Sequence, residues 1–324
     1  MNKELNLWQF IDNQLNINEK VMLLVVVEST GSSPGRKGFK MVVNTEGGLC
    51  GSIGGGIMEI KLVELAKDLL QKEGNVAFLK KQIHHKNVLH DQSGMICSGE
   101  QTILFFTLQK KDLPTVQQIV QSLEKSLPIV LKLTPQYFQV FENQKLIHPF
   151  YFVSINETHF VFTENLGFKN ELYIIGGGHC ALALSELMSK MDFYIHLFDD
   201  RSDLNTVEKN KFVHEKHLVE YSEIGSYIPS GNNVYVVVMT VGYRTDALVI
   251  RQLLDKKLRY LGVLGSAAKM QTLLHDLENE GYTSNILRGI HTPIGLKINS
   301  QTPEEIAVSI AAEIIAVKNE KCRT

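Results

Sequence analysis

Three consecutive glycines between an apolar strand and a helix constrain this chain more than any other feature. Leu172–Ile175 has the pattern of a short buried strand, it runs directly into Gly176–Gly178, and Ala181–Met188 has a helical pattern. The resulting GxGxxA spacing lets the backbone approach a phosphate, and the helix start offers free N–H groups. Asp199 and Asp200 end the next predicted strand, where a carboxylate can accept a hydrogen bond from a ribose hydroxyl. The pattern predicts a nucleotide-like ligand; the alternative is a tight turn in which Asp199 caps a loop.

Strand and helix patterns continue to alternate after the glycines, which predicts a parallel sheet with helices on both faces. A helix follows at the end of the chain, because Thr302 suits an N-cap, Pro303 suits the first helical position and Glu305 completes a capping box. The predicted strands are 193–198, 234–239 and 258–263, and the predicted helices are 246–254 and 269–277.

The first half of the chain has a different organisation, which predicts an α+β domain without internal repeats. It opens with strand patterns at 21–28 and 39–45, a helix pattern from Met58, and further strands at 76–83 and 102–107. A length of 324 residues is sufficient for two domains. The polar and glycine-containing stretch 164–171 breaks the pattern, so we expect an α+β domain over 1–166 and a Rossmann-like doubly wound α/β domain over 167–324.

Charge and hydropathy narrow the classes of partner. The chain has 33 Lys and Arg against 35 Asp and Glu, which gives a net charge of -2. Because this charge is not positive, the overall electrostatics do not favour binding to nucleic acid. The apolar runs are far shorter than the roughly 20 residues of a membrane span, and the N-terminus does not resemble a secretory signal. Four scattered cysteines without a CxxC pair fit a reducing compartment. These features predict a cytoplasmic protein that binds neither nucleic acid nor membrane.

A second junction of glycines with a helix occurs in the first half of the chain. Ser52 is followed by Gly54, Gly55 and Gly56, and the helix pattern then includes Glu59. Two anion-receptive junctions could hold the ends of one phosphate-bearing ligand if they faced each other across an interdomain cleft. A simple turn is about as good an explanation of this loop.

Cys97 lies in a segment of small residues just before a predicted strand. An accessible thiolate there would suit a soft metal or a sulfur species, whereas a lone cysteine is more often a small core residue. His84, His85 and His90 form a polar cluster without recognisable ligand spacing, which indicates a surface loop.

Polar residues also follow two later strands of the predicted parallel sheet. Thr240, Arg244 and Asp246 follow one strand, and Ser266 and Lys269 follow the next. Open α/β sheets bind ligands at the carboxyl ends of their strands, so these residues are candidates for the same site, with ordinary helix capping as the alternative.

Together these motifs resemble the XdhC/CoxI family of xanthine dehydrogenase accessory factors, over about 21–316. The motifs are Gly31-Ser32-x-Pro34, Gly51-Ser52-Ile53-Gly54-Gly55-Gly56-x-x-Glu59, Met95-Ile96-Cys97, Gly176-Gly177-Gly178-His179, Asp199-Asp200-Arg201, Gly265-Ser266-x-x-Lys269, His291-x-Pro293-Ile294-Gly295-Leu296 and Thr302-Pro303-Glu304-Glu305-Ile306-Ala307.

The resemblance implies a cofactor-binding maturation factor rather than an enzyme. Proteins of the family assist molybdenum hydroxylases: they bind molybdenum cofactor, protect it while a cysteine desulfurase supplies its sulfido ligand, and deliver it. The cofactor, molybdopterin or its nucleotide form, carries a phosphate or a diphosphate that suits both glycine junctions. Cys97 matches the family's cofactor-associated cysteine, so it would contact molybdenum. Ser98 and Ile57 depart from residues common in the family, so a two-thiol site is not expected.

Two other function classes fit the second domain, because a fold does not fix a function. An NAD(P)-dependent oxidoreductase would need an acid or base beside the nicotinamide, and His179, His291 and Tyr243 are the candidates. A dinucleotide-sensing module would need no chemistry. The partners expected from the resemblance are a molybdenum hydroxylase of the xanthine dehydrogenase type and a cysteine desulfurase, and the sequence leaves open whether the chain also forms a homodimer.

Overall fold

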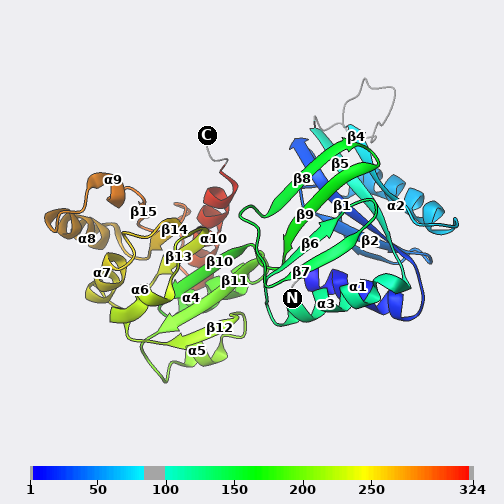
Figure 1. Cartoon of the computed structure of the whole chain (residues 1–324). Coiled ribbons are helices and arrows are strands. Elements are labelled where there is room, and N and C mark those ends of the chain that lie inside the picture. Colours follow the sequence, from blue (N-terminus) through cyan, green and yellow to red (C-terminus); the bar gives the residue numbers. More distant parts are fainter. Residues whose placement is uncertain (1–2, 84–98, 321–324) are drawn as a thin grey trace. The chain divides into compact units, whose positions relative to one another are not determined.

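The structure, a computed structural model, describes residues 3–83 and 99–320. The chain divides into two compact units, Met1–Gly167 (unit 1) and Phe168–Thr324 (unit 2). Each unit has helices and strands of its own (Figure 1). Each unit also has hydrophobic clusters of its own.

Unit 1 begins with a helix and a five-stranded antiparallel sheet of order β3-β2-β1-β5-β4. The central strand β1 contains the run Val21–Val27, in which every residue is buried. Alternate β1 side chains pack on α2 on one face and on α1 and α3 on the other, which explains why the run is continuously apolar. The elements are α1 (Lys3–Asn16), β1 (Val21–Gly31), β2 (Lys40–Asn44), β3 (Leu49–Gly51), α2 (Gly56–Leu70), β4 (Ala77–Ile83) and β5 (Gly99–Leu108).

A second antiparallel sheet, of order β7-β6-β9-β8, completes unit 1. Its inner face joins the α1 and α3 side of the first sheet in one hydrophobic cluster. The elements are η1 (Lys110–Asp112), α3 (Leu113–Glu124), β6 (Ile129–Leu133), β7 (Phe138–Glu142), β8 (Phe150–Asn156) and β9 (His159–Leu166).

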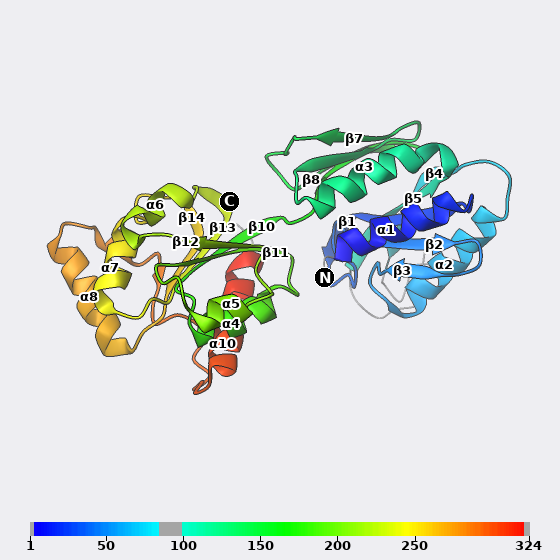
Figure 2. The same ribbon diagram turned by 90° about the horizontal axis from the view of Figure 1, so that it is seen from below.

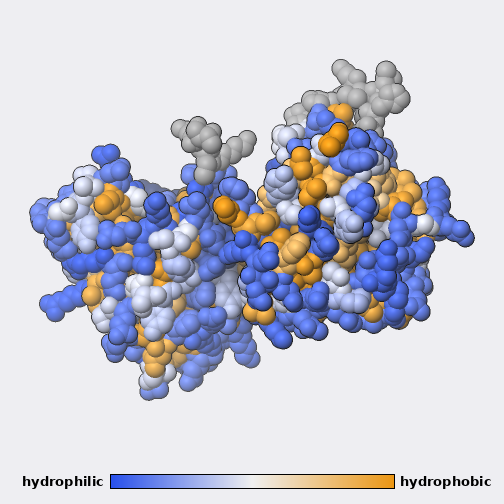
Figure 3. All heavy atoms as spheres, viewed as in Figure 1, coloured by the Kyte–Doolittle hydropathy of each residue, from blue (hydrophilic) through white to orange (hydrophobic). Residues whose placement is uncertain are grey.

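The edge strand β8 exposes apolar side chains on its outer face. Tyr151, Val153 and Ile155 are 56%, 46% and 88% exposed, as expected for side chains that alternate along a strand. Figure 3 shows apolar side chains gathered over this region of unit 1.

Unit 2 contains a six-stranded parallel sheet of order β12-β11-β10-β13-β14-β15. Counted along the chain within the unit, this is the order 3-2-1-4-5-6 of a dinucleotide-binding Rossmann fold. The predicted doubly wound α/β architecture is therefore confirmed. The elements are β10 (Asn170–Ile175), α4 (His179–Met188), β11 (Phe193–Asp199), α5 (Asn205–Lys209), β12 (Glu215–Leu218), η2 (Tyr221–Glu223), α6 (Ile224–Tyr227), β13 (Gly231–Val238), α7 (Tyr243–Arg251), β14 (Leu258–Val263), α8 (Ala267–Asn279), α9 (Ser284–Leu287), β15 (Ile290–His291) and α10 (Pro303–Asn319).

Helices cover both faces of this sheet. Helices α4 and α10 pack on one face, and α6, α7 and α8 pack on the other; Figure 2 shows α4, α5 and α10 gathered on one side of the strands. Thr302 caps α10, and the Glu305 carboxylate accepts from the Thr302 N–H, so the predicted capping box is present. Within 3–83 and 99–320, none of the helices combines the length and apolar character needed to cross a membrane.

Candidate functional site

The glycine turn of unit 2 lies between β10 and α4, as the sequence predicts. Gly176 has φ +103°, and a Cβ there would lie 2.4 Å from the Met239 carbonyl oxygen. A Cβ on Gly177 would lie 2.3 Å from a Val207 methyl group, whereas a Cβ on Gly178 would meet nothing within 4 Å. Packing therefore requires glycine at the first two positions. Gly178, the N-cap of α4, borders open space. The start of a helix suits an anionic group.

Asp199 binds the same glycine turn rather than remaining free. Its Oδ2 accepts from the Gly177 N–H at 2.6 Å and from Arg201 Nη2 at 2.8 Å, and its Oδ1 accepts from the backbone N–H and Nε of Arg201 at 3.0 and 2.8 Å. Burial alone would raise the pKa of Asp199, but these hydrogen bonds and the guanidinium charge hold it below its ordinary value. All four acceptor positions are in use. The neighbouring Asp200 is exposed, and its Oδ1 lies 3.9 Å from Arg201 Nε.

A second polar cluster lies at the carboxyl ends of β13 and β14. Asp246 of α7 is fully buried, and it accepts hydrogen bonds from the backbone and hydroxyl of Thr240. Lys269 of α8 donates to the other Asp246 oxygen at 2.6 Å, and the Lys269 side chain is 26% exposed. Ser266 caps α8 by accepting from the Lys269 N–H. The structure thus brings together Asp246 and Lys269, which are 23 positions apart.

The strand order places these groups at one edge of the sheet. Gly176–Gly178 follow β10 and Thr240 follows β13; these neighbouring strands form the point where the order reverses, and open α/β sheets bind ligands there. His179 and Arg244 are exposed in the first turns of α4 and α7.

His291 belongs to a different network, formed with α10. Its Nδ1 lies 3.4 Å from Glu313 Oε1, and its ring packs 4.5 Å from that of Tyr260. The other Glu313 oxygen accepts from Tyr260 and, at 2.9 Å, from the Gly295 N–H. Burial and this carboxylate raise the pKa of Tyr260. Glu313 therefore holds the loop after β15 against α10, and His291 has a structural partner.

In unit 1 the glycine junction precedes α2, and Glu59 folds back onto it. One Glu59 oxygen, Oε2, accepts from Ser52 Oγ at 2.7 Å and from the N–H groups of Ile53 and Gly55, both at 2.9 Å. The N–H of Gly54 donates to Ser52 Oγ at 3.2 Å. The loop already binds a carboxylate of its own chain.

Gln101 of β5 ties this loop to a second one. Its Oε1 accepts from Ser33 Oγ at 2.6 Å and from the Gly35 N–H at 3.1 Å, and its Nε2 donates to the Ile53 carbonyl at 3.4 Å. Gly99, the first residue of β5, pairs with Gly31 and lies against Ser33. Gln101 thus connects the loops 31–38 and 51–56 of unit 1 to each other.

Several predicted residues lie outside the described part of the chain. Cys97 is among them, as are His84, His85 and His90. The expectation that the two glycine junctions face each other across a cleft stays a prediction.

The structure also reveals a group that sequence reasoning missed: His196, Glu215 and His217 could hold a metal ion. The available signal was the Glu-x-His pattern at 215–217, since residues two apart on a strand share a face.

Comparisons with known proteins agree on one family. A family model described as the XdhC Rossmann domain matches residues 172–314, and one described as the XdhC and CoxI family matches residues 15–80. The chain is 24% identical over 301 residues to an uncharacterized protein, YqeB, of Escherichia coli K12, covering 91% of this chain and 43% of YqeB. It is 23% identical over 341 residues to a probable xanthine dehydrogenase subunit of Bacillus subtilis 168, covering 97% of this chain and 98% of the relative.

One solved structure shares the fold over the whole length. A crystal structure described as a xanthine dehydrogenase from Bacillus halodurans superposes with a TM-score of 0.69, at 22% identity, covering 100% of this chain and 98% of that one. At this level of identity the likeness concerns the fold.

Proposed function

This chain belongs to the XdhC and CoxI family, and we propose that it is an accessory factor that binds molybdenum cofactor and delivers it to a hydroxylase of the xanthine dehydrogenase type. Family membership supports an accessory role toward xanthine dehydrogenase. The proposal extends this accessory role to binding and delivery of molybdenum cofactor. The protein would carry the cofactor as cargo and would not keep it as a permanent prosthetic group.

The observation that carries the proposal is the open position at Gly178. Both forms of the cofactor contain phosphate, and a helix start with free N–H groups favours an oxyanion. A Cβ at Gly178 would meet nothing within 4 Å, so the backbone is accessible there, while Gly176 and Gly177 are closed by packing. We therefore assign the phosphate to the start of α4 in unit 2.

Two cationic side chains at the same sheet edge would support phosphate binding. Lys269 is held by Asp246 and remains 26% exposed, and Arg244 is exposed in the first turn of α7. The ammonium and guanidinium groups would strengthen hydrogen bonding to an anion.

In unit 1 we propose that the glycine loop contributes little to phosphate binding and that Cys97 contacts the metal centre. The N–H groups of Ile53 and Gly55 already donate to Glu59, so this loop is a poorer phosphate site than the α4 start. We assign the thiolate of Cys97 to the molybdenum or its sulfur ligand, because soft thiolates suit a sulfur-rich metal centre. Cys97 precedes Gly99 by two positions, and Gly99 lies against the loop at Ser33.

Dinucleotide binding is the second candidate, favoured by the 3-2-1-4-5-6 strand order of unit 2. It would make the chain an NAD(P)-dependent oxidoreductase or a sensor. The acceptor positions of the Asp199 carboxylate are already occupied by donors of its own chain. A ribose hydroxyl would therefore have to be recognised by the exposed Asp200.

The test is to identify what the purified protein retains and where. Pterin fluorescence of the oxidised, denatured protein should reveal bound cofactor. Gly178→Val should reduce retained pterin about tenfold or more, because a charge-assisted hydrogen bond is worth about 1.5–3 kcal/mol. Glu186→Val, on the exposed side of the same helix, is the matched control and should retain pterin normally.

A second variant tests the thiolate. Cys97→Ser should weaken retention of the molybdenum-bearing cofactor more than that of metal-free pterin. Unchanged retention of both forms and unchanged activation of a partner hydroxylase would refute the role of Cys97. Copurification of NAD(P) without pterin would replace the proposal with the second candidate.

A further inference from the structure

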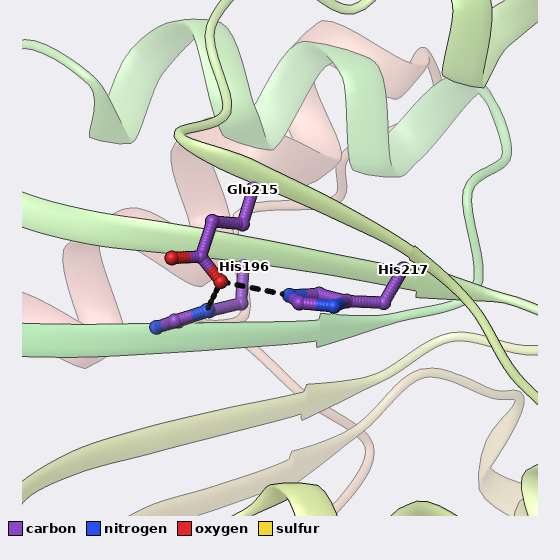
Figure 4. A group of neighbouring side chains, drawn as sticks. All are labelled: His196, Glu215 and His217. Carbon is purple, nitrogen blue, oxygen red and sulfur yellow. Dashed lines mark ion pairs between the residues drawn. The ribbon is translucent and has the colours of Figure 1, made fainter.

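Two histidines and a glutamate gather on one face of the unit 2 sheet. His196 lies on β11, and Glu215 and His217 lie on the neighbouring strand β12. The register pairs His196 with Glu215 and Phe198 with His217, so the three side chains share a face. Figure 4 shows the Glu215 carboxylate between the two rings.

The three side chains present their donor atoms to one point. Glu215 Oε2 lies 3.0 Å from His217 Nε2 and 3.3 Å from His196 Nδ1. One nitrogen from each ring and one oxygen of Glu215 all lie within 4.8 Å of one another. Two ligands of a single zinc ion are about 3–4 Å apart, because Zn–N and Zn–O distances are about 2.0–2.2 Å. Small side-chain rotations would complete such a set.

An unsatisfied ring nitrogen provides an independent observation. His217 Nε2 is buried and lies 3.0 Å from Glu215 Oε2, but it has no partner in hydrogen-bond geometry. Buried polar groups are normally satisfied, and leaving one without a partner costs about 1–3 kcal/mol. A cation bound between the two rings would give the lone pair of His217 Nε2 a partner, whereas His196 would bind through Nδ1, the nitrogen that faces Glu215.

Neighbouring aromatic residues hold the three side chains in position. The His196 ring stacks on Tyr173 at 4.4 Å, and the His217 ring stacks on Phe198 at 4.5 Å. The hydroxyl of Tyr194 donates to Glu215 Oε1 at 2.8 Å, which leaves Oε2 directed at the histidines. Contacts that orient ligands in this way are typical of metal sites.

Charge also favours a cation at this place. The carboxylate of Glu215 supplies a negative charge within 3.3 Å of a nitrogen of each ring. A second carboxylate, that of Glu171, lies 3.9 Å from His196 Nε2.

We propose that His196, Glu215 and His217 form a binding site for a divalent transition-metal ion, most favourably zinc. Two imidazoles and one carboxylate match the His₂Glu sets that hold zinc with a fourth position open to water or another ligand. Among common divalent ions, magnesium and calcium prefer oxygen ligands, so the two imidazoles favour zinc or its neighbours in the transition series. The site does not depend on the proposed cofactor role.

Zinc titration of the full-length, untagged protein after treatment with a chelator tests the site. Isothermal titration should give one tight site for each chain, and Co²⁺ should give the visible absorption of a four- or five-coordinate ion. The variants keep the local packing: His196→Phe and His217→Phe retain an aromatic ring, and Glu215→Gln retains an acceptor for Tyr194. Each should weaken zinc binding at least about 100-fold, since even changes next to metal ligands cost about 10–100-fold.

His275→Gln, an exposed histidine on α8, is the matched control and should bind zinc like the unmodified protein. Circular dichroism establishes that each variant is folded, and Glu215→Gln, the mildest change, remains informative if a phenylalanine variant is not. Absence of tight zinc binding, or equal binding in folded Glu215→Gln protein, would overturn the proposal, because zinc would then bind elsewhere among the 11 histidines and 4 cysteines.

Discussion

At the scale of single residues, Asp199 shows how one carboxylate can organise a glycine turn. Its oxygens accept hydrogen bonds from the Gly177 N–H and from the guanidinium of Arg201. Asp199, at the end of β11, therefore holds the glycine turn that follows β10. The spacing of the sequence predicts an acidic residue here. It does not predict that Arg201, only two positions later, takes the acceptor positions that a ribose would use.

Replacement of this carboxylate should lower stability in a pH-dependent way. Asp199→Asn keeps an acceptor for Gly177 but removes the charge that faces Arg201. We expect a loss of about 1–2 kcal/mol at pH 7, toward the low end for charged hydrogen bonds because Arg201 is 41% exposed. Urea unfolding measures the difference, and Asp200→Asn, at the exposed neighbour, should show much less.

The sign of the pH dependence follows from the lowered pKa of Asp199. A carboxyl group whose pKa falls on folding contributes stability that is fully present above its unfolded value of about 3.9 and is lost as the pH falls through the folded value. The difference between the unmodified protein and Asp199→Asn should therefore be constant near neutrality and shrink below about pH 4. A difference that grows on acidification would contradict this assignment.

At the scale of elements, the patterns with strong periodicity were predictable. The run from Val21 gives β1, the alternation after residue 171 gives the parallel sheet, and Thr302 with Glu305 begins α10. Their local signals and tertiary environments agree, as in most of a folded chain.

Two other elements were missed, one despite a periodic signal and one because it has none. Helix α1 was not predicted, although Leu7, Ile11 and Leu15 form a buried stripe at helical spacing. Strand β12 has the sequence Glu-Lys-His-Leu, which has little strand propensity. Its pairing with β11 determines its structure, and for that reason the cluster of two histidines and a glutamate on these strands was also missed.

The ion pair between α7 and α8 gives a prediction at this scale. Lys269→Met would leave the fully buried Asp246 with Thr240 as its remaining partner. Loss of one member of a buried pair costs about 3–5 kcal/mol, and we expect about 2–3 kcal/mol because Lys269 is partly exposed. Denaturant unfolding should show this loss, with Lys257→Met, an exposed lysine, near the unmodified value.

A double variant tests whether Asp246 and Lys269 contribute to stability as a coupled pair. Asp246→Asn in the Lys269→Met background removes the uncompensated buried charge, so the double variant should be more stable than Lys269→Met alone. Strictly additive losses would show that the two side chains are not coupled.

At the scale of the whole molecule, each unit has separate hydrophobic clusters, and the chain carries a natural probe for one of them. The hydrophobic clusters of unit 1 lie within residues 7–166, and those of unit 2 lie within 172–317. The single tryptophan, Trp8, is fully buried in unit 1, where it stacks on Phe138 at 6.1 Å. Its fluorescence therefore reports the unfolding of unit 1 alone.

Separate cores predict separate unfolding transitions, because domains with their own cores can unfold as independent units. Gly176→Ala places a Cβ 2.4 Å from the Met239 carbonyl at φ +103°, a strain of about 1–3 kcal/mol, so it should lower the calorimetric transition of unit 2 by about 2–4 °C for each kcal/mol. The Trp8 fluorescence transition should stay in place. Leu24→Ala, in the buried centre of β1, should have the reverse effect, with a cost of about 2–5 kcal/mol in unit 1. If Gly176→Ala moved the Trp8 transition as far as the calorimetric one, the two units would unfold as one, and their cores could not be treated as independent.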